Sequence, residues 1–285
     1  MQSVTKRNPV ESDAGRGPGD GFDKLVLGTW MQCMEDYGQV WREDFGRTFF
    51  SQEYWYLFVV ALVRHWHREP LNVGDARATM RTGSPKTRET RLKRLVDEGW
   101  FSKIKNESDL RVTYIVPTPA LLALAQRHLS NSLARVTAGL AEANLVPGHR
   151  VTAVRGLSDD GRDVPRLLLA WAEFLVGYTN DWNETFRNRF HTEEYWYPFV
   201  HSLRADWSGE PLTMSEACSV MRTGSIRTGE ARIALAATRG LLEKRKSETD
   251  HRKILILPTP LLEASLVEHF SRTLSQVLKL LDEHC

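Results

Sequence analysis

The chain of 285 residues repeats one block of sequence at a fixed distance of 141 residues. Residues 80–87 read Met-Arg-Thr-Gly-Ser-Pro-Lys-Thr, and residues 221–228 read Met-Arg-Thr-Gly-Ser-Ile-Arg-Thr. The same offset, without any insertion, aligns Glu-Tyr-Trp-Tyr at 53–56 with the same four residues at 194–197. Roughly 40 of about 110 aligned positions are identical, which chance does not produce at a fixed period. Because this period is too long for a solenoid repeat, we expect each copy to be a domain with its own core.

The repeat and the composition around its copies predict four segments. Residues 1–22 are rich in Gly, Pro, Asp and Ser, and we expect them to form a disordered tail. The first domain is expected to span residues 23–142, and the second is expected to span residues 165–285. Between them, residues 143–164 contain turn-forming Pro-Gly and Asp-Gly pairs, and this segment is predicted to be a linker.

Within each copy, the hydrophobic pattern predicts helices in the first part. Apolar residues recur every three or four positions over about 24–48, which is typical of a long amphipathic helix. A second helix carries the Tyr-Trp-Tyr triplet, and a short helix and a Gly-containing turn follow it. The next helix is predicted at 85–98, because Ser84 suits the N-cap and Pro85 suits the first helical position. Its counterpart in the second copy is predicted at 226–239, so each copy should contain a helix-turn-helix.

The pattern changes after this helix. Residues 100–105 and 112–116 are predicted to be two strands on either side of a polar tip, which together form a β-hairpin, or wing. Pro119 then begins a long helix that runs to about residue 142. The expected fold class is therefore mainly α with small β wings (α+β).

The basic residues are concentrated in the same part of both copies. The net charge of the whole chain is only +2. Residues 81–113 nevertheless contain nine Lys and Arg against five Asp and Glu, and residues 222–254 contain nine against four. The rest of the chain must therefore be acidic, and the helix-turn-helix and wing of each copy carry the positive charge. This distribution favours a polyanionic partner.

The helix after each Gly-containing turn offers polar and basic side chains to such a partner. Leu92, Leu95 and Val96 are predicted to face inward, with Arg88, Arg91 and Arg94 on the opposite side. A helix of this kind fits the major groove of duplex DNA, where Arg can bind guanine and hydroxyl groups can bind phosphates or base edges. The residues predicted to contact DNA on the two helices are Ser84, Lys86, Thr87, Arg88, Arg91, Ser225, Arg227, Thr228 and Arg232. The alternative for this face is a solvated charged surface.

Each predicted wing carries an Asp two residues before an Arg. These pairs are Asp109 with Arg111 and Asp250 with Arg252. A narrow minor groove concentrates negative potential and favours an inserted Arg. The alternative is a surface ion pair within the wing, which would contribute little to stability.

The order of elements resembles that of the MarR/SarA family of winged-helix transcription regulators. The residues that carry the resemblance are Ser84, Thr87, Arg91, Gly99, Asp109, Arg111 and Thr118, with Ser225, Thr228, Arg232, Gly240, Asp250, Arg252 and Thr259 in the second copy. The resemblance implies two winged helix-turn-helix domains in a pseudo-twofold arrangement, with terminal helices that pack across the pseudo-twofold axis. It also implies that Arg111 and Arg252 enter the minor groove and that Asp109 and Asp250 orient them.

The function expected on these grounds is that of a sequence-specific, double-stranded DNA-binding transcription regulator in a bacterial cytoplasm, associated with the nucleoid. It would act as a monomeric pseudo-dimer or as a homodimer of that unit. Two alternatives are a plasmid-type replication initiator and an adaptor that binds proteins instead of DNA. Arg88, Lys93 and Arg94 align with Gly229, Ala234 and Leu235, so we expect an imperfect palindrome whose better-read half contacts the first domain.

Aromatic residues are also repeated between the copies. Trp30, Tyr54, Trp55, Trp171, Tyr195 and Trp196 fit either a packed core or a pocket for a small aromatic effector. Many relatives in the family that the chain resembles bind aromatic acids between their DNA-binding and dimerising parts. The sequence leaves both interpretations open.

Other kinds of function have no support in the sequence. We find no nucleophile–base arrangement, Gly-rich phosphate loop or paired-carboxylate motif, so we expect no enzymatic activity, no cofactor and no metal. The three cysteines are sparse and unpatterned, which suggests reduced thiols; Cys33 fits a buried helix residue or a redox sensor. No apolar run approaches the length of a membrane span, and the first residues lack the apolar core of a secretory signal.

Overall fold

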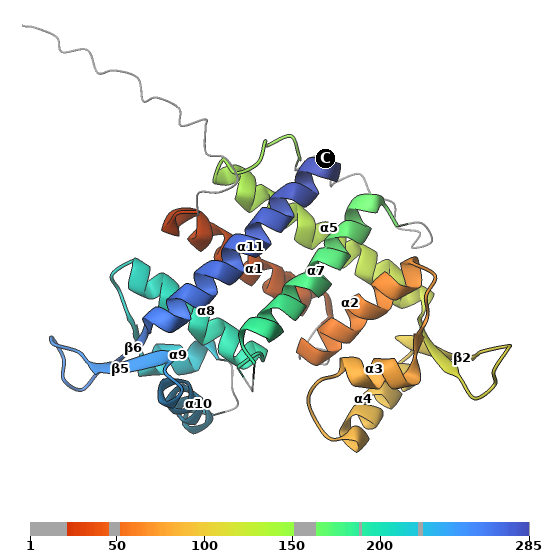
Figure 1. Ribbon diagram of the computed structural model, residues 1–285, viewed down its shortest axis with the longest axis horizontal. Coiled ribbons are helices and arrows are strands. Elements are labelled where there is room, and N and C mark those ends of the chain that lie inside the picture. The colour runs from red at the N-terminus through yellow and green to blue at the C-terminus, as the bar shows by residue number, and fades with distance from the viewer. Residues whose placement is uncertain (1–21, 46–51, 151–163, 188–189, 222–224, 285) are drawn as a thin grey trace, which may run out of the picture.

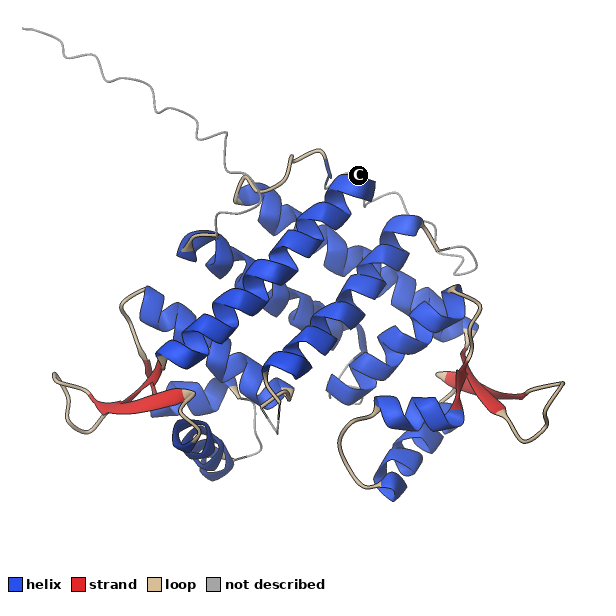
Figure 2. Cartoon of the chain, viewed as in Figure 1, coloured by secondary structure: helices blue, strands red, loops and turns tan. Residues whose placement is uncertain are grey.

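A computed structural model describes residues 22–45, 52–150, 164–187, 190–221 and 225–284. These residues form a mainly helical structure with two small three-stranded antiparallel sheets (Figures 1 and 2). The expected α+β class is confirmed at this level. Of the expected tail at 1–22, all but Phe22 lies outside the described residues, as does 151–163 of the expected linker.

The two halves contain the same elements in the same order. The first half consists of α1 (Lys24–Phe45), α2 (Gln52–Trp66), β1 (Leu71–Asn72), α3 (Val73–Thr79), α4 (Pro85–Asp97), β2 (Phe101–Lys105), β3 (Thr113–Pro117) and α5 (Pro119–Glu142). The second half consists of α7 (Arg166–Thr185), α8 (Glu193–Trp207), β4 (Leu212–Thr213), α9 (Met214–Val220), α10 (Ile226–Thr238), β5 (Leu242–Lys246), β6 (Ile254–Pro258) and α11 (Pro260–His284).

Local signals in the sequence set the ends of α4 and α10. The hydroxyl oxygens of Ser84 and Ser225 each accept a hydrogen bond from a backbone N–H three residues later, both at 3.2 Å. Gly99 and Gly240 follow the helices with φ of +79° and +72°, a region that favours glycine. The predicted N-cap of α4 is confirmed, and α10 is capped in the same way.

Each sheet contains one strand that the sequence did not predict. The strand orders are β1-β3-β2 and β4-β6-β5, and all pairings are antiparallel. In the first sheet, Ile115 on β3 pairs with Leu71 on one side and with Lys103 on the other. The added strands β1 and β4 are two residues long, so they are too short to show an alternating pattern.

A threonine joins each sheet to the long helix that follows it. The Thr118 hydroxyl donates to the Gly99 carbonyl oxygen at 2.9 Å, and its oxygen accepts from the backbone N–H of Leu121 at 3.3 Å. Thr259 makes the same two contacts in the second half. The end of α4 and the start of α5 are therefore held together, as are the end of α10 and the start of α11.

The long helices of both halves pack together in the centre of the molecule (Figure 1). α1 packs on α5 within the first half and on α11 of the second, while α7 packs on α11 and on α2 and α5 of the first half. The indole N–H of Trp30 donates to the Thr273 hydroxyl at 2.9 Å, and that of Trp171 donates to the Ser132 hydroxyl at 3.2 Å. These four residues occupy aligned positions, so the two bonds are related by the repeat.

The buried side chains of the two halves form one continuous cluster. This differs from the expectation that each copy has a core of its own. The reason is that the large side chains of each half, Trp30 and Trp171 above all, are buried against the long helices of the other half. Within the part of the chain that is described, no helix is long and apolar enough to span a membrane.

Candidate nucleic-acid interface

Helices α4 and α10 lie at the same edge of the molecule (Figure 1). The hairpin that follows each of them extends outward from the body, one on either side. Both helices have buried residues on one face and exposed residues on the other. The two predicted contact helices are therefore brought to a common surface.

The open face of α4 carries hydroxyl and amino groups. Leu92 and Leu95 are buried, and the exposed residues near the start of the helix include the predicted Ser84, Lys86 and Thr87. Three further exposed residues, Thr90, Lys93 and Arg94, were not among the predicted contacts. Thr90 and Lys93 follow Lys86 at i+4 and i+7, so this spacing was the signal that could have found these two residues.

The orientation predicted for Arg88 is wrong. Arg88 lies four residues before Leu92 and seven before Leu95, so it projects over the same inward face of the helix. It is half-buried, and its Nη1 donates to the Arg77 carbonyl oxygen of α3 at 3.4 Å. Arg91 is also half-buried, and its Nη1 donates to the Thr82 carbonyl oxygen in the turn at 3.2 Å.

Two exposed cations on α4 have carboxylate partners one turn later. Lys93 pairs with Asp97, and Arg94 pairs with Glu98 at 2.6 Å. Exposed pairs of this kind contribute little to the stability of a helix. A phosphate or a base edge can therefore replace the carboxylates at little cost.

The second helix differs in its contacts. Ser225, Arg227 and Thr228 are exposed as predicted, but Arg232 is half-buried and pairs with Glu194 of α8 at 2.8 Å. Gly229, which aligns with Arg88, is buried, and a Cβ there would lie 3.0 Å from Cys218. The small residue lets α10 approach α9 closely.

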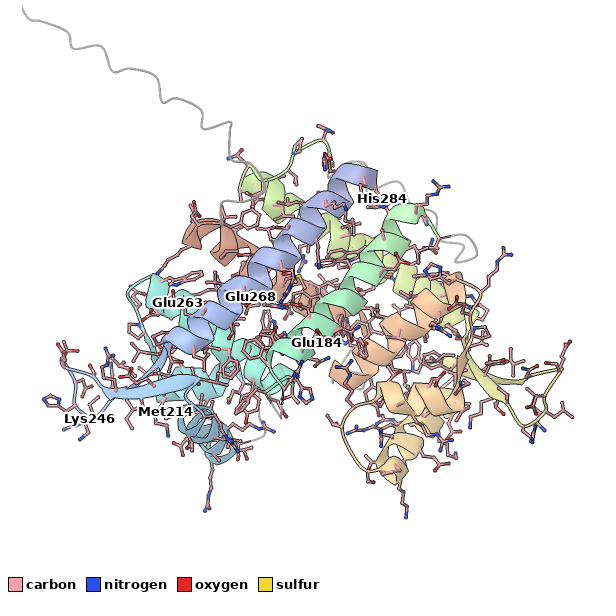
Figure 3. All side chains as sticks on the ribbon, viewed as in Figure 1. Glu184, Met214, Lys246, Glu263, Glu268 and His284 are labelled. Atoms are coloured by element: carbon pink, nitrogen blue, oxygen red, sulfur yellow. The ribbon has the colours of Figure 1, made fainter. Side chains whose placement is uncertain are left out.

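Both hairpins have an aspartate that shapes the turn before the basic residue. Asp109 Oδ1 accepts from the backbone N–H of Arg111 at 3.0 Å and from its Nε at 3.1 Å. The backbone N–H of Arg252 donates to Asp250 at 3.1 Å. The Arg111 side chain is 92% exposed, and its hydrogen bond keeps the pKa of Asp109 below the ordinary value. Figure 3 shows Lys246 on the second hairpin, away from the body of the molecule.

An aromatic cavity of about 110 Å³ lies between the two halves. Three pairs of aligned aromatic residues line it, together with four other residues: Tyr37 and Tyr178, Trp41 and Trp182, Trp55 and Trp196, with Met34, Gly38, Thr179 and Tyr197. Trp55 and Trp196 were predicted for such a pocket. The other predicted residues, Trp30, Tyr54, Trp171 and Tyr195, are buried in the core, so the packed-core alternative holds for these four.

Two tyrosines give the cavity polar groups. The indole N–H of Trp55 donates to the Tyr37 hydroxyl, and that of Trp196 donates to the Tyr178 hydroxyl at 2.8 Å. Burial raises the pKa of both tyrosines above the ordinary value. Both hydroxyls therefore keep their protons at neutral pH, and each has a proton that it can donate to a ligand.

The wall of the cavity is connected to the turn before α4. Asn180 lies on α7, directly after two residues that line the cavity. Its side-chain oxygen accepts from the Tyr56 hydroxyl at 2.7 Å and from Arg81 Nη2 at 2.8 Å. Arg81 lies four residues before α4, in the turn between α3 and α4. Asn180 of the second half therefore contacts the helix-turn-helix of the first half.

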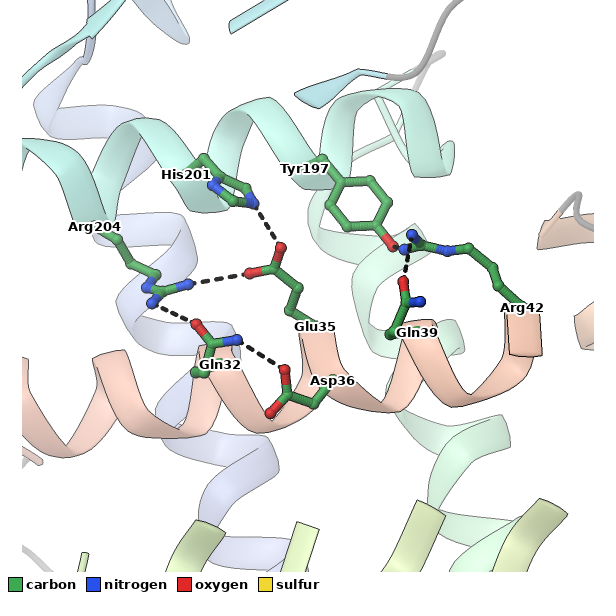
Figure 4. A network of polar contacts seen from close by, with 8 residues as sticks. All are labelled: Gln32, Glu35, Asp36, Gln39, Arg42, Tyr197, His201 and Arg204. Carbon is green, nitrogen blue, oxygen red and sulfur yellow. Dashed lines mark hydrogen bonds and ion pairs between the residues drawn. The ribbon is translucent and has the colours of Figure 1, made fainter. Parts of the chain in front are cut away.

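A polar network joins α1 of the first half to α8 of the second (Figure 4). Glu35 accepts from His201 at 3.0 Å and from Arg204 at 3.1 Å, and Arg204 also donates to Gln32 at 2.6 Å. Burial alone would raise the pKa of Glu35, but these two partners lower it below the ordinary value. Glu35 is therefore ionised at neutral pH and holds the two helices together.

Other kinds of site gain no support from the geometry. In the described part of the chain, no three His, Cys, Asp or Glu side chains are grouped closely enough to bind a metal ion. Cys33 and Cys218 are buried free thiols, and burial raises the pKa of Cys33 to about 12. A thiol that stays protonated is a poor redox sensor, so the buried-residue interpretation of Cys33 fits better.

No family model and no curated protein sequence matches this chain.

Proposed function

We propose that the chain is a sequence-specific, double-stranded DNA-binding transcription regulator with two winged helix-turn-helix units. The observation that carries this proposal is the common edge formed by α4 and α10, each flanked by a basic hairpin (Figure 1). A single duplex can contact both helices only if they lie on one side of the protein. The acidic remainder of the chain disfavours binding through any other surface.

In this proposal the two helices enter successive major grooves. Lys86 and Lys93 of α4 reach base edges or phosphates, and the hydroxyl groups of Ser84 and Thr87 bind the backbone beside them. Arg111 and Arg252 extend from the hairpins toward the adjacent minor grooves. The chain acts in a bacterial cytoplasm, as an internal pseudo-dimer or as a dimer of that unit.

Two alternatives are less well supported. A replication initiator with tandem units would bind direct repeats, whereas the repeat-related bonds of Trp30 and Trp171 favour units related by a pseudo-twofold axis and inverted half-sites. A protein-binding adaptor would not require positive charge at the same place in both copies. The pattern of protected DNA and the salt dependence of duplex binding distinguish these three candidate functions.

The experiment that tests the proposal is selection of bound sequences from random duplex DNA, followed by affinity measurements at several salt concentrations. We expect Lys86→Ala with Lys93→Ala to weaken binding by about tenfold or more and to reduce the salt slope, because two cationic contacts are lost. The matched control is Lys279→Ala on α11, since Lys279 is exposed and paired with Glu283 one turn away, as Lys93 is with Asp97. Equal effects of both changes, or no preference for any sequence, would contradict the proposal.

The aromatic cavity supports a small aromatic effector as a second partner. Its walls favour a flat ring, and the Tyr37 and Tyr178 hydroxyls favour an oxygen acceptor on that ring. Occupation of the cavity would alter α7 and, through Asn180, the position of Arg81 before α4. Titration with small aromatic acids and phenols, followed by tryptophan fluorescence and DNA release, tests this; a ligand whose binding is unchanged by Tyr178→Phe would argue against the site.

A further inference from the structure

The two units carry similar positive charge in different places. Helix α4 has five basic residues, Lys86, Arg88, Arg91, Lys93 and Arg94, whereas α10 has two, Arg227 and Arg232. The hairpins show the reverse. The first contains Lys103, Lys105 and Arg111, and the second contains Lys244, Arg245, Lys246, Arg252 and Lys253. The first unit therefore has more of its basic residues on the helix, and the second unit has more of them on the hairpin.

Beside the exposed Arg227, Thr228 and Glu230, α10 carries small and apolar residues outside the core. Ala231 is exposed, Ala234 and Leu235 are half-exposed, and Ile226 at the start of the helix is 69% exposed. In the alignment of the two copies, Ala231 corresponds to Thr90 and Ala234 to Lys93. Leu235 corresponds to Arg94, and Ile226 corresponds to Pro85. Arg227, Ala231 and Ala234 share one face at i, i+4 and i+7. Ala231 and Ala234 therefore place methyl groups where α4 carries the polar side chains of Thr90 and Lys93.

Little free charge remains on this face. Arg232 is held by Glu194 of α8 at 2.8 Å. Arg227 is exposed on the outward side of α10, and the exposed Glu230 in the next turn offsets its charge. A helix of this composition has few groups for the polar edge of guanine. It suits the methyl group of thymine, which Ala and other apolar side chains contact in the major groove.

We infer that the two units read a duplex by different chemistry: α4 reads a half-site that contains guanine, and α10 reads a thymine-rich half-site through its methyl groups. This inference rests on the proposed function. The five basic residues of the second hairpin supply the phosphate contacts that α10 lacks, because phosphate contacts position a protein without reading sequence. The second hairpin therefore anchors the unit on the duplex while α10 reads the bases, which replaces the expectation of one better-read half.

The test uses the full chain and the duplex selected by it. Each thymine of the site is replaced in turn by deoxyuridine, which lacks only the 5-methyl group. We expect a loss of about fourfold in affinity for each contacted methyl in the half-site bound by α10, since about 0.8 kcal/mol accompanies each buried methyl-sized group. The same replacement in the half-site bound by α4 should leave the affinity unchanged.

Reciprocal variants assign each half-site to its helix. Ala231→Thr with Ala234→Lys gives α10 the polar residues of α4, and we expect the selected second half-site to shift from thymine to guanine. Lys93→Ala is the matched change in α4, and it should relax the guanine preference in the first half-site alone. Two identical half-sites, insensitivity to deoxyuridine, or a second half-site without sequence preference, as expected if α10 binds a protein, would overturn the inference. Absence of any specific duplex binding would instead remove the proposed function itself.

Discussion

Two aligned histidines are buried beside carboxylates in the two halves. The Nδ1 of His128 lies 2.8 Å from Asp44, and that of His269 lies 2.5 Å from Asp181. The histidines are 141 residues apart, but the position aligned with Asp44 is four residues beyond Asp181, which is one helical turn. Burial lowers the pKa of both histidines, although each carboxylate partly opposes this effect. Both rings are therefore neutral at pH 7.

These histidines make stability depend on pH. Because their pKa values in the folded state lie below the unfolded value of 6.5, the unfolded chain binds more protons as the pH falls below 6.5. The free energy of unfolding should be highest above that pH and should decrease on acidification, by about 1.4 kcal/mol for each unit of pKa shift. Urea unfolding at pH 8, 7, 6 and 5 measures this. The double variant His128→Gln and His269→Gln should flatten the profile, and a wild-type profile that rises toward pH 5 would contradict the account.

A second residue-scale prediction concerns the hydrogen bonds between halves. Thr273→Val keeps the side-chain shape but leaves the buried indole N–H of Trp30 without its acceptor. We expect a loss of about 1–3 kcal/mol in the free energy of unfolding, which is the cost of an unsatisfied buried polar group. Thr273→Ser is the control because it keeps the hydroxyl. If the Thr273→Val and Thr273→Ser variants were equally stable in chemical denaturation, the hydrogen bond from Trp30 would have no energetic role.

At the scale of elements, the sequence predicted where α4 begins but not which way all of its side chains face. The start of α4 followed from Ser84 and Pro85, because capping depends on neighbours in the chain. The inward direction of Arg88 was missed, because a charged residue was assumed to face solvent although its spacing from Leu92 placed it inside. The aromatic cavity could not be located from the sequence, since its walls come from both halves and depend on how they pack.

The glycine after α4 gives an element-scale prediction. Gly99 has a φ of +79° and open space around its Cβ position, so Gly99→Ala adds backbone strain without a clash. We expect the free energy of unfolding to fall by about 1–2 kcal/mol. Gly28→Ala is the control, because Gly28 lies inside α1 and also has open space, so it should raise stability by about 0.5–1 kcal/mol. Thermal or chemical denaturation should show changes of opposite sign; equal signs would contradict the role assigned to Gly99.

At the scale of the whole molecule, the equivalence of the two halves is imperfect. The contact between α1 and α8 depends on the ionised Glu35 with His201 and Arg204 (Figure 4). The aligned positions in the contact between α2 and α7 are Val176, Val60 and Val63, which are partly buried against the core. The repeat predicted the equivalence of the two halves. The alignment alone reveals that these three positions differ between the copies. It does not reveal that they contact one another, because that depends on how the two halves pack.

The central claim is that two copies of one module present α4 and α10 to a single duplex from the same edge of the protein. Hydroxyl-radical and methylation footprinting of the full chain on its selected duplex tests this most directly. We expect two protected major-groove segments on one face of the DNA, about one helical turn or a multiple of it apart. Lys86→Ala with Lys93→Ala should remove protection from one segment, and Arg227→Ala should weaken the other. A single protected segment, or two segments on opposite faces of the duplex, would contradict the account.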